Sequence, residues 1–210
     1  NGAQERSLVG HMAVGVPGSV AGLWALHRRY GLLPWEDVVA PSVLLARVGF
    51  VVDADFVSSA ALVAPLFARF PASRALFASP DHPLRVGDRW QNPDLGATLE
   101  RIAASGPGDF YRGETARLIA TEMKRGGGLI TRADLAAYEP KWRTPVSFVY
   151  RNHRVLSMPP PSSGGLVLAF VAGFLAPYDL GRSGPASAKT LHLLAEALRR
   201  GFALRNHYLA

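Results

Sequence analysis

The sequence predicts an α+β fold that is rich in helix and contains one β-hairpin. Apolar residues recur at helical spacing along most of the chain, and Gly, Pro or Asn marks the ends of these segments. One stretch differs, because Val146, Phe148 and Tyr150 alternate with other residues as in a strand. More β-forming residues follow Arg151-Asn152-His153, which predicts a hairpin within 144–158. With 210 residues, 49% of them hydrophobic, the chain is long enough for one sizeable core.

Capping residues and chain breakers set the expected helices before the hairpin. Ser19, Asp53 and Thr131 have side chains that accept hydrogen bonds from the first free amides of a helix. Asn92 has the same property, and the proline that follows it suits the first helical position. A second proline, Pro41, is expected to interrupt the pattern and begin a new helix. The expected helices cover residues 20–30, 34–39, 41–48, 54–63, 92–105, 113–125 and 131–138.

Two helices are expected after the hairpin. Residues 165–176 carry no charge and are apolar on every face, which predicts a helix that is buried on all sides. Residues 186–208 predict a long amphipathic helix that packs through one apolar stripe. This stripe consists of Leu191, Leu194, Ala195, Leu198 and Phe202.

Composition argues against several classes of function. The formal net charge is +7, but the basic residues are scattered instead of forming a stripe, so we expect no nucleic-acid partner. The chain has no Cys, and its six His form no HxH or HxxxH pair, so we expect no metal site and no cofactor. The helical part of the longest uncharged run is shorter than the ~20 residues that span a membrane, so no membrane span is expected.

The most distinctive motif is a turn rich in proline, serine and glycine that follows the hairpin. Its prolines fix an extended backbone, its serines can cap the next helix, and its glycines let a backbone or a ligand approach closely. The sequence lacks the G-x-S-x-G elbow of serine hydrolases, so we interpret the motif as a structural turn. Its residues of interest are Pro160, Pro161, Ser162, Ser163, Gly164 and Gly165.

Other polar residues give no clear catalytic site. Glu36 with Asp37, and Asp53 with Asp55, have the spacing of a carboxylate pair, but all four lie at expected helix starts, where a carboxylate suits the helix dipole. Asn1 has no hydroxyl or thiol, so it is not an N-terminal nucleophile. Two lone histidines near the motifs, which we interpret as structural, are His11 and His153.

Four sequence blocks carry a resemblance to a known family. They are AVGVPGSVAG at 13–22, GPGDFYRG at 106–113, GGGLITRADLAAY at 126–138 and VLSMPPPSSGG at 155–165. In residues and in order they resemble the large subunit of the gamma-glutamyltransferase (gamma-glutamyltranspeptidase) family. The resemblance runs from about Val9 to the last residue and implies an interior segment of that subunit. Residues 1–210 are therefore expected to form a single partial domain.

The resemblance implies an N-terminal-nucleophile hydrolase with a four-layer αββα sandwich. Such a precursor cuts itself in two, and a Thr at the start of the small subunit acts as nucleophile and, through its own amine, as base. The implied partners are that small subunit and γ-glutamyl small molecules such as glutathione, and no catalytic residue is expected in this chain. A periplasmic or secreted location is implied, although the absence of Cys permits any compartment.

One departure from the family pattern keeps alternatives open. The family commonly has Asp where Leu204 precedes Arg205, so Arg205 is expected to lack that ion pair. A non-catalytic binding domain on a degenerate scaffold is one alternative. The others are an amidase like the beta-lactam acylases and a serine hydrolase that uses Ser163.

Overall fold

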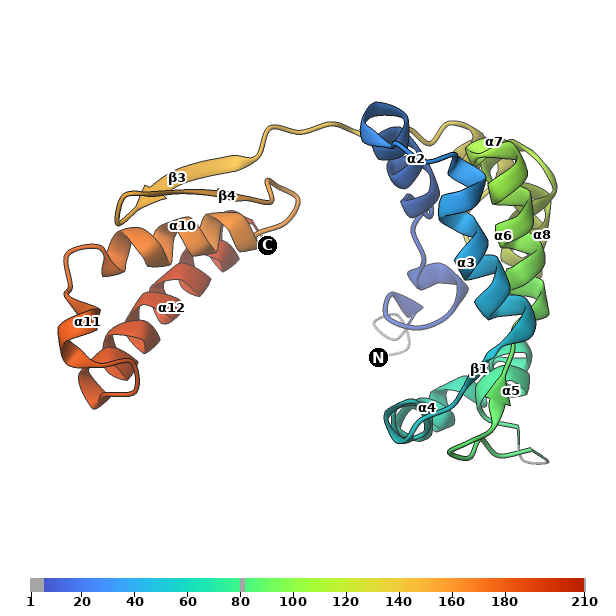
Figure 1. Cartoon of the computed structure of the whole chain (residues 1–210), viewed down its shortest axis with the longest axis horizontal. Coiled ribbons are helices and arrows are strands. Elements are labelled where there is room, and N and C mark those ends of the chain that lie inside the picture. The colour runs from blue at the N-terminus through green and yellow to red at the C-terminus, as the bar shows by residue number, and fades with distance from the viewer. Residues whose placement is uncertain (1–5, 80–81, 210) are drawn as a thin grey trace. The chain divides into compact units, whose positions relative to one another are not determined.

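The computed structural model describes residues 6–79 and 82–209, so Asn1 lies outside the described residues. The predicted α+β class is confirmed, because helices dominate and two small antiparallel sheets accompany them. The chain divides into two compact units, Asn1–Pro140 and Lys141–Ala210 (Figure 1). Each unit has a hydrophobic core of its own. The expectation of a single partial domain stays a prediction.

In the first unit, three of the helices begin at the predicted capping residues Asp53, Asn92 and Thr131. Asp53 accepts a hydrogen bond from the amide of Phe56 at 2.8 Å, and Asn92 accepts one from Leu95 at 3.0 Å. Its elements are η1 (His11–Ala13), α2 (Ser19–Tyr30), α3 (Trp35–Val48), β1 (Phe50–Val51), α4 (Ala54–Phe67), α5 (Pro71–Phe77), β2 (Arg89–Trp90), α6 (Pro93–Ser105), α7 (Pro107–Arg112), α8 (Glu114–Gly126) and α9 (Arg132–Ala136).

Two sequence predictions in this unit are wrong. Ser19 is not the cap of α2, because Gly18 occupies the N-cap position and no side chain bonds the first amides. Pro41 does not separate two helices, since α3 runs through it without a break. A proline removes one helical hydrogen bond, but packing can maintain the helix. Here α3 lies along α6, and the indole of Trp35 donates to the carbonyl of Ile102 at 2.8 Å.

A short two-stranded sheet in this unit has no counterpart in the predicted elements. β1 and β2 pair antiparallel, with Phe50 opposite Trp90. Trp90 stacks on Phe77 with ring centroids 5.3 Å apart and donates its indole N–H to the carbonyl of Leu76 at 3.1 Å. Two-residue strands are too short to show alternation in a sequence, so aromatic packing decides their pairing.

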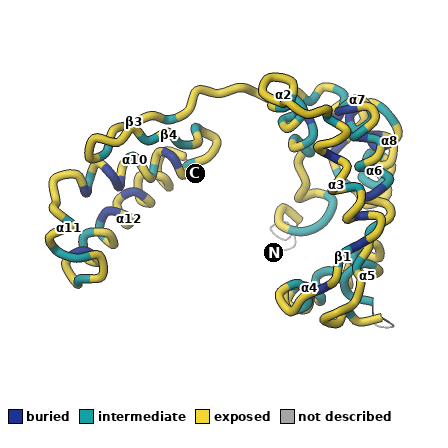
Figure 2. Tube along the Cα trace, in the orientation of Figure 1, coloured by how far each residue is buried: buried dark blue, intermediate teal, exposed yellow. Residues whose placement is uncertain are grey.

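The core cluster of the first unit is small, and its buried residues come from α2, α7, α8, α9 and the loop before α9. Figure 2 colours the buried positions dark blue. Leu135 and Ala116 are fully buried. Thr131 is the N-cap of α9, as predicted, and forms a capping box with Asp134. In this box Thr131 accepts from the amide of Asp134 while the Asp134 carboxylate accepts from the amide of Thr131 at 2.8 Å. The cluster consists of Ala21, Tyr111, Ala116, Ile130 and Leu135.

Over residues 141–209, the second unit is a hairpin followed by three helices, the second of them short. The predicted hairpin is confirmed, and Arg151 and Asn152 both have positive φ, 46° and 66°, as a two-residue hairpin turn of the primed type requires. The elements are β3 (Val146–Tyr150), β4 (His153–Ser157), α10 (Gly164–Leu175), α11 (Leu180–Ser183) and α12 (Ala188–Tyr208).

The burial predicted for α10 and α12 is wrong, because α10 is only partly covered and α12 is covered through other residues. α10 is buried through Val171 and Leu175, where the hairpin and α12 pack on it, but Leu168 is 48% exposed. α12 packs on α10, but not through the predicted stripe. Its buried residues are Thr190, Ala197 and Gly201, and the predicted leucines face outward.

Candidate functional site

The serine- and glycine-rich turn links β4 to α10. The Pro160–Pro161 peptide bond is cis. Ser162 accepts a hydrogen bond from the amide of Gly164 at 3.3 Å, so it closes the turn at the start of the helix. Ser163 occupies the N-cap position as expected, but its hydroxyl bonds no helix amide. Ser163 therefore occupies the predicted N-cap position, but the predicted hydrogen bond from a helix amide to its hydroxyl is absent.

The hydroxyl of Ser163 instead accepts a hydrogen bond from Nε of Arg205, at 3.0 Å. Arg205 lies near the end of α12, so the contact ties the turn to a helix 42 residues away in the sequence. A second nitrogen of Arg205 donates to Oδ1 of Asn206 at 3.0 Å. Among the residues that the structure describes, no carboxylate pairs with Arg205. The effect of Leu204 on Arg205 stays a prediction.

Gly165 is the glycine of this turn that has no room for a side chain. A Cβ on it would lie 2.3 Å from the carbonyl oxygen of Met158 and 3.1 Å from Cβ of Ser157. Gly164 is not restricted in this way, since its nearest neighbour would be the Ser162 hydroxyl at 3.5 Å. The close approach predicted for these glycines is made at Gly165 by the backbone of Met158.

The described part of the turn contains no nucleophile paired with a base. Ser162 and Ser163 bond a backbone amide and a guanidinium, and neither hydroxyl bonds a histidine. His153 instead contacts the carbonyl oxygen of Arg151, with Nδ1 2.9 Å away. A groove of about 260 Å³ opens beside Arg205, between the first half of α10 and the end of α12. Its lining is mostly apolar, and its polar side chains are Arg205 and Tyr208.

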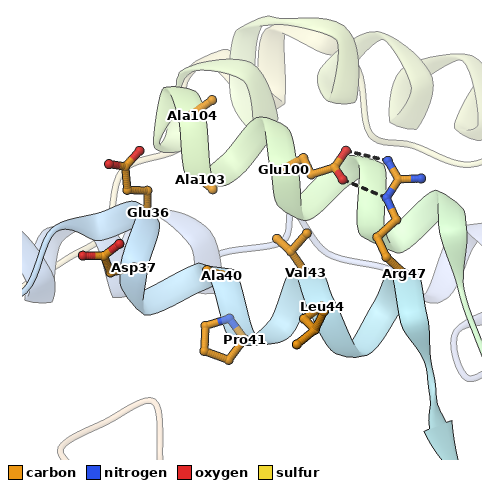
Figure 3. Close-up of a pocket in the computed structure, with 10 residues that line it drawn as sticks. All are labelled: Glu36, Asp37, Ala40, Pro41, Val43, Leu44, Arg47, Glu100, Ala103 and Ala104. Carbon is orange, nitrogen blue, oxygen red and sulfur yellow. Dashed lines mark hydrogen bonds and ion pairs between the residues drawn. The ribbon is translucent and has the colours of Figure 1, made fainter.

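The first carboxylate pair of the sequence lines a wider groove between α3 and α6. Figure 3 shows Glu36 and Asp37 at one end of this groove and the pair of Arg47 with Glu100 at the other. Its volume is about 800 Å³, and its floor is formed by alanines, Pro41 and aliphatic side chains. Because Glu36 and Asp37 occupy the first turn of α3, stabilisation of the helix dipole accounts for them.

Arg47 and Glu100 form a two-pronged ion pair across the same groove. Nε of Arg47 donates to Oε1 of Glu100 at 2.8 Å, and Nη2 donates to Oε2 at 2.5 Å. The hydrogen bonds from Arg47 hold the pKa of Glu100 below its ordinary value. Both side chains are exposed, so the pair adds little stability to the contact of α3 with α6. It occupies the Glu100 carboxylate, and Glu36 and Asp37 are the other acids that line the groove.

Three of the four sequence blocks meet at Tyr111, which the sequence analysis did not single out. Its hydroxyl donates to the carbonyl of Pro17 at 2.6 Å and accepts from the amide of Ala21 at 3.2 Å. Its ring stacks on Tyr138, with centroids 5.6 Å apart and planes inclined by 6°. Burial raises the pKa of Tyr111, which is only 3% exposed. The Tyr138 hydroxyl in turn lies where a side chain on Gly18 would be.

Asp109, from the same block as Tyr111, holds the start of α8. It accepts from the backbone amide of Glu114 at 2.9 Å and from the hydroxyl and amide of Thr115, and Nε of Arg101 donates to it at 3.1 Å. Burial acts to raise the pKa of Asp109, but the hydrogen bonds from Thr115 and the amides lower it on balance. Both carboxylate oxygens accept hydrogen bonds from the protein's own groups, including the first amides of α8, so Asp109 acts as a capping residue.

His11 is also bonded within the protein. Its Nε2 lies 2.7 Å from Oε1 of Glu122, and Glu122 also accepts two hydrogen bonds from Arg125. The hydrogen bonds from Arg125 and His11 lower the pKa of Glu122 to about 2. Across residues 6–79 and 82–209 no cluster of three metal-binding side chains forms.

Comparison with known proteins identifies the family of this chain. The family model of Gamma-glutamyltranspeptidase matches residues 1–210. The chain belongs to the gamma-glutamyltranspeptidase family. The glutathione hydrolase proenzyme of Escherichia coli K12 is 41% identical over 213 residues, a match that covers 100% of this chain and 36% of that protein. The gamma-glutamyltranspeptidase of Helicobacter pylori superposes with a TM-score of 0.95 at 35% identity, covering 98% of this chain and 59% of that one.

A third relative of this chain is named an acylase, unlike the two relatives above. The Acylase ACY 1 proenzyme of Pseudomonas sp. strain SE83 is 38% identical over 200 residues, covering 95% of this chain and 36% of that protein. The chain thus spans little more than a third of the length of these curated relatives. Within the described ranges, no helix is both long and apolar enough to cross a membrane.

Proposed function

We propose that this chain is an interior part of the large subunit of an enzyme that transfers γ-glutamyl groups to water or to amino acids. The observation that carries the proposal is the match to a glutathione hydrolase proenzyme at 41% identity over the whole chain. The sequence blocks support it, because their residues are used for packing and capping in the described structure and leave the chemistry to another segment.

The reaction proposed for the assembled enzyme uses a threonine outside these 210 residues. The hydroxyl of an N-terminal Thr attacks the γ-glutamyl carbonyl carbon, and its own amine takes the proton. The amide C–N bond breaks, the amine product leaves with a proton, and a γ-glutamyl ester remains on the Thr. Water or an amino acid then attacks the ester and restores the hydroxyl. The partners are the small subunit and γ-glutamyl compounds.

A chimeric precursor tests the proposal. Residues 1–210 replace the matching segment of the Escherichia coli glutathione hydrolase proenzyme, and hydrolysis of a γ-glutamyl anilide is measured alongside the 210-residue chain alone. We expect the chimera to cut itself and hydrolyse the anilide, and the isolated chain to be inactive. Hydrolysis by the purified chain alone, or an intact and inactive chimera that is folded, would contradict the proposal.

An amidase of the acylase type is a second candidate, and the 38% identity to Acylase ACY 1 proenzyme favours it. The same chimera does not decide between the two, because its active site would come from the Escherichia coli protein. The deciding observation is the coding sequence on either side of these 210 codons. Expression of that complete gene, with a γ-glutamyl anilide and a cephalosporin amide offered in competition, should give the larger kcat/KM with the anilide.

A further inference from the structure

α12 carries two apolar stripes side by side. The first lies against the rest of the second unit, where Ala197 is fully buried and Leu193 is half-buried. Its members follow each other at positions i, i+3, i+7 and i+11, and are Thr190, Leu193, Ala197 and Gly201. The second stripe has the same spacing one residue further along, so it lies about 100° around the helix. We name it the outer stripe, and it consists of Leu191, Leu194, Leu198 and Phe202.

An ordinary surface helix buries its large apolar side chains, whereas α12 covers mostly small residues and exposes large ones. Three of the four residues on the covered stripe are small, and a Cβ on Gly201 would already lie 3.3 Å from Val171 of α10. All four residues of the outer stripe are large, and Leu191 and Phe202 are 55% and 49% exposed. α10 adds Phe170, 39% exposed, next to Gly201. A continuous apolar strip of this kind marks an interaction surface.

The charged residues of α12 indicate which kind of partner surface would complement the outer stripe. α12 carries four basic residues and a single acidic one, and that residue, Glu196, already pairs with Arg199 and Arg200. Arg205 adds a cation that pairs with no carboxylate within the described chain. At about 100° per residue, Arg205 lies beside the outer stripe, whereas Lys189 and Arg200 lie on the opposite face of the helix. The complementary surface is therefore an apolar strip with an acidic edge that faces Arg205. A second copy of this helix fits poorly, because its single acid, Glu196, is already paired and offers Arg205 no free carboxylate.

We propose that the outer stripe is the face on which the remainder of the precursor packs. The inference rests on the proposed function, since it takes the occupant to be the other part of a gamma-glutamyltranspeptidase-type precursor. The length of the relatives supports this occupant, because almost two thirds of the Escherichia coli protein lies outside the segment that this chain matches. The partner segment then carries the apolar strip and the acidic edge.

A single thiol on the outer stripe tests the proposal. The chain has no Cys, so Leu198→Cys reports its own exposure through the rate of maleimide labelling. The variant is made in the 210-residue chain and in the Escherichia coli chimera, with the introduced thiol as the only one. Ala203→Cys is the matched control, since Ala203 is exposed on the far side of the same helix.

The expected result is fast labelling of Leu198→Cys in the isolated chain and labelling slower by more than about tenfold in the chimera, as burial behind a well-packed interface requires. Ala203→Cys should react fast in both proteins. Equal rates for Leu198→Cys in chain and chimera would overturn the proposal. Slow labelling in the isolated chain that becomes fast on dilution, with a dimer in light scattering, would also overturn it in favour of a second copy.

Labelling and catalysis separate the two proposals. A chimera that protects Leu198→Cys but neither cuts itself nor hydrolyses the anilide refutes the proposed function and keeps the docking face. A chimera that is active while Leu198→Cys stays fully reactive refutes the docking face and keeps the function.

Discussion

In the first unit three sequence motifs meet inside one core, whereas in the second unit the remaining motif lies mostly on the surface. Tyr111 is buried and joins Pro17 to Ala21 through one hydroxyl. Ser163 is only half-buried and meets an exposed Arg205. Equally distinctive sequence blocks thus have different structural roles. One set holds a core together, and the other holds a turn beside an uncovered apolar strip.

The largest difference between the units should appear at Tyr111. Tyr111→Ala removes a buried ring from the core and should lower the free energy of unfolding of the first unit by about 3–5 kcal/mol. Tyr111→Phe keeps the ring but leaves the Pro17 carbonyl and the Ala21 amide unpaired, which costs about 1–3 kcal/mol. Urea unfolding of the 210-residue chain, followed by tryptophan fluorescence, measures both. A loss below about 1 kcal/mol for Tyr111→Ala would show that the motifs are not joined here.

A smaller effect is expected where α10 meets α12 in the second unit. Gly201→Leu forces a side chain against Val171 and Val167 and should destabilise the unit by about 1–3 kcal/mol. Gly173→Leu is the control, because Gly173 has no neighbour within 4 Å, and helix propensity should stabilise it by up to about 1 kcal/mol. Hydrogen exchange of peptides from α10 and α12 measures the two changes. Effects of the same sign would contradict the packing described for α12.

The bond between Ser163 and Arg205 should contribute less. Ser163→Ala and Arg205→Ala, combined in a double-mutant cycle, should give a coupling energy of about 0.5–1 kcal/mol in the free energy of unfolding of the second unit. The value is small because the guanidinium is exposed to water. A coupling near zero would mean that the turn is held by Ser162 and Gly165 without help from α12.

The smallest effect is a pH dependence in the first unit. The pKa of Glu122 is lowered to about 2 in the folded chain, against about 4.3 in an unfolded one. A lowered pKa stabilises the fold above the unfolded value, and this contribution is lost as the pH falls from about 4.3 towards 2. Glu122→Gln should flatten the slope of stability against pH in that window. The change should be modest since Glu122 is 45% exposed, and an unchanged slope would mean that the pairs with His11 and Arg125 do not persist in solution.

The sequence predicted local features well where a few neighbouring residues determine them. The caps at Asp53, Asn92 and Thr131 and the hairpin turn at Arg151-Asn152 depend on hydrogen bonds and φ angles within a few residues. Pro41 was misjudged because packing of α3 on α6 outweighs one lost helical bond.

The errors about the site have a different cause. Periodicity identifies an apolar stripe but does not say which partner covers it, so the large residues of α12 were assigned to a contact that its small residues make. The role of Tyr111 depends on a contact over 94 residues, which no local pattern contains. The six residues of the turn remain a predicted motif, and the structure adds the Ser163 contact to Arg205, which the sequence did not indicate.

The hydroxyl of Tyr111 also limits how this chain can vary in length. It bonds Pro17 and Ala21, four residues apart, from a ring that the core holds fixed. An insertion or deletion between those two residues would break at least one bond, so homologous loops of other lengths cannot be grafted there. The turn at Gly87 is less restricted, because a Cβ on Gly87 would have no neighbour within 4 Å, so extra residues would be accommodated more easily there.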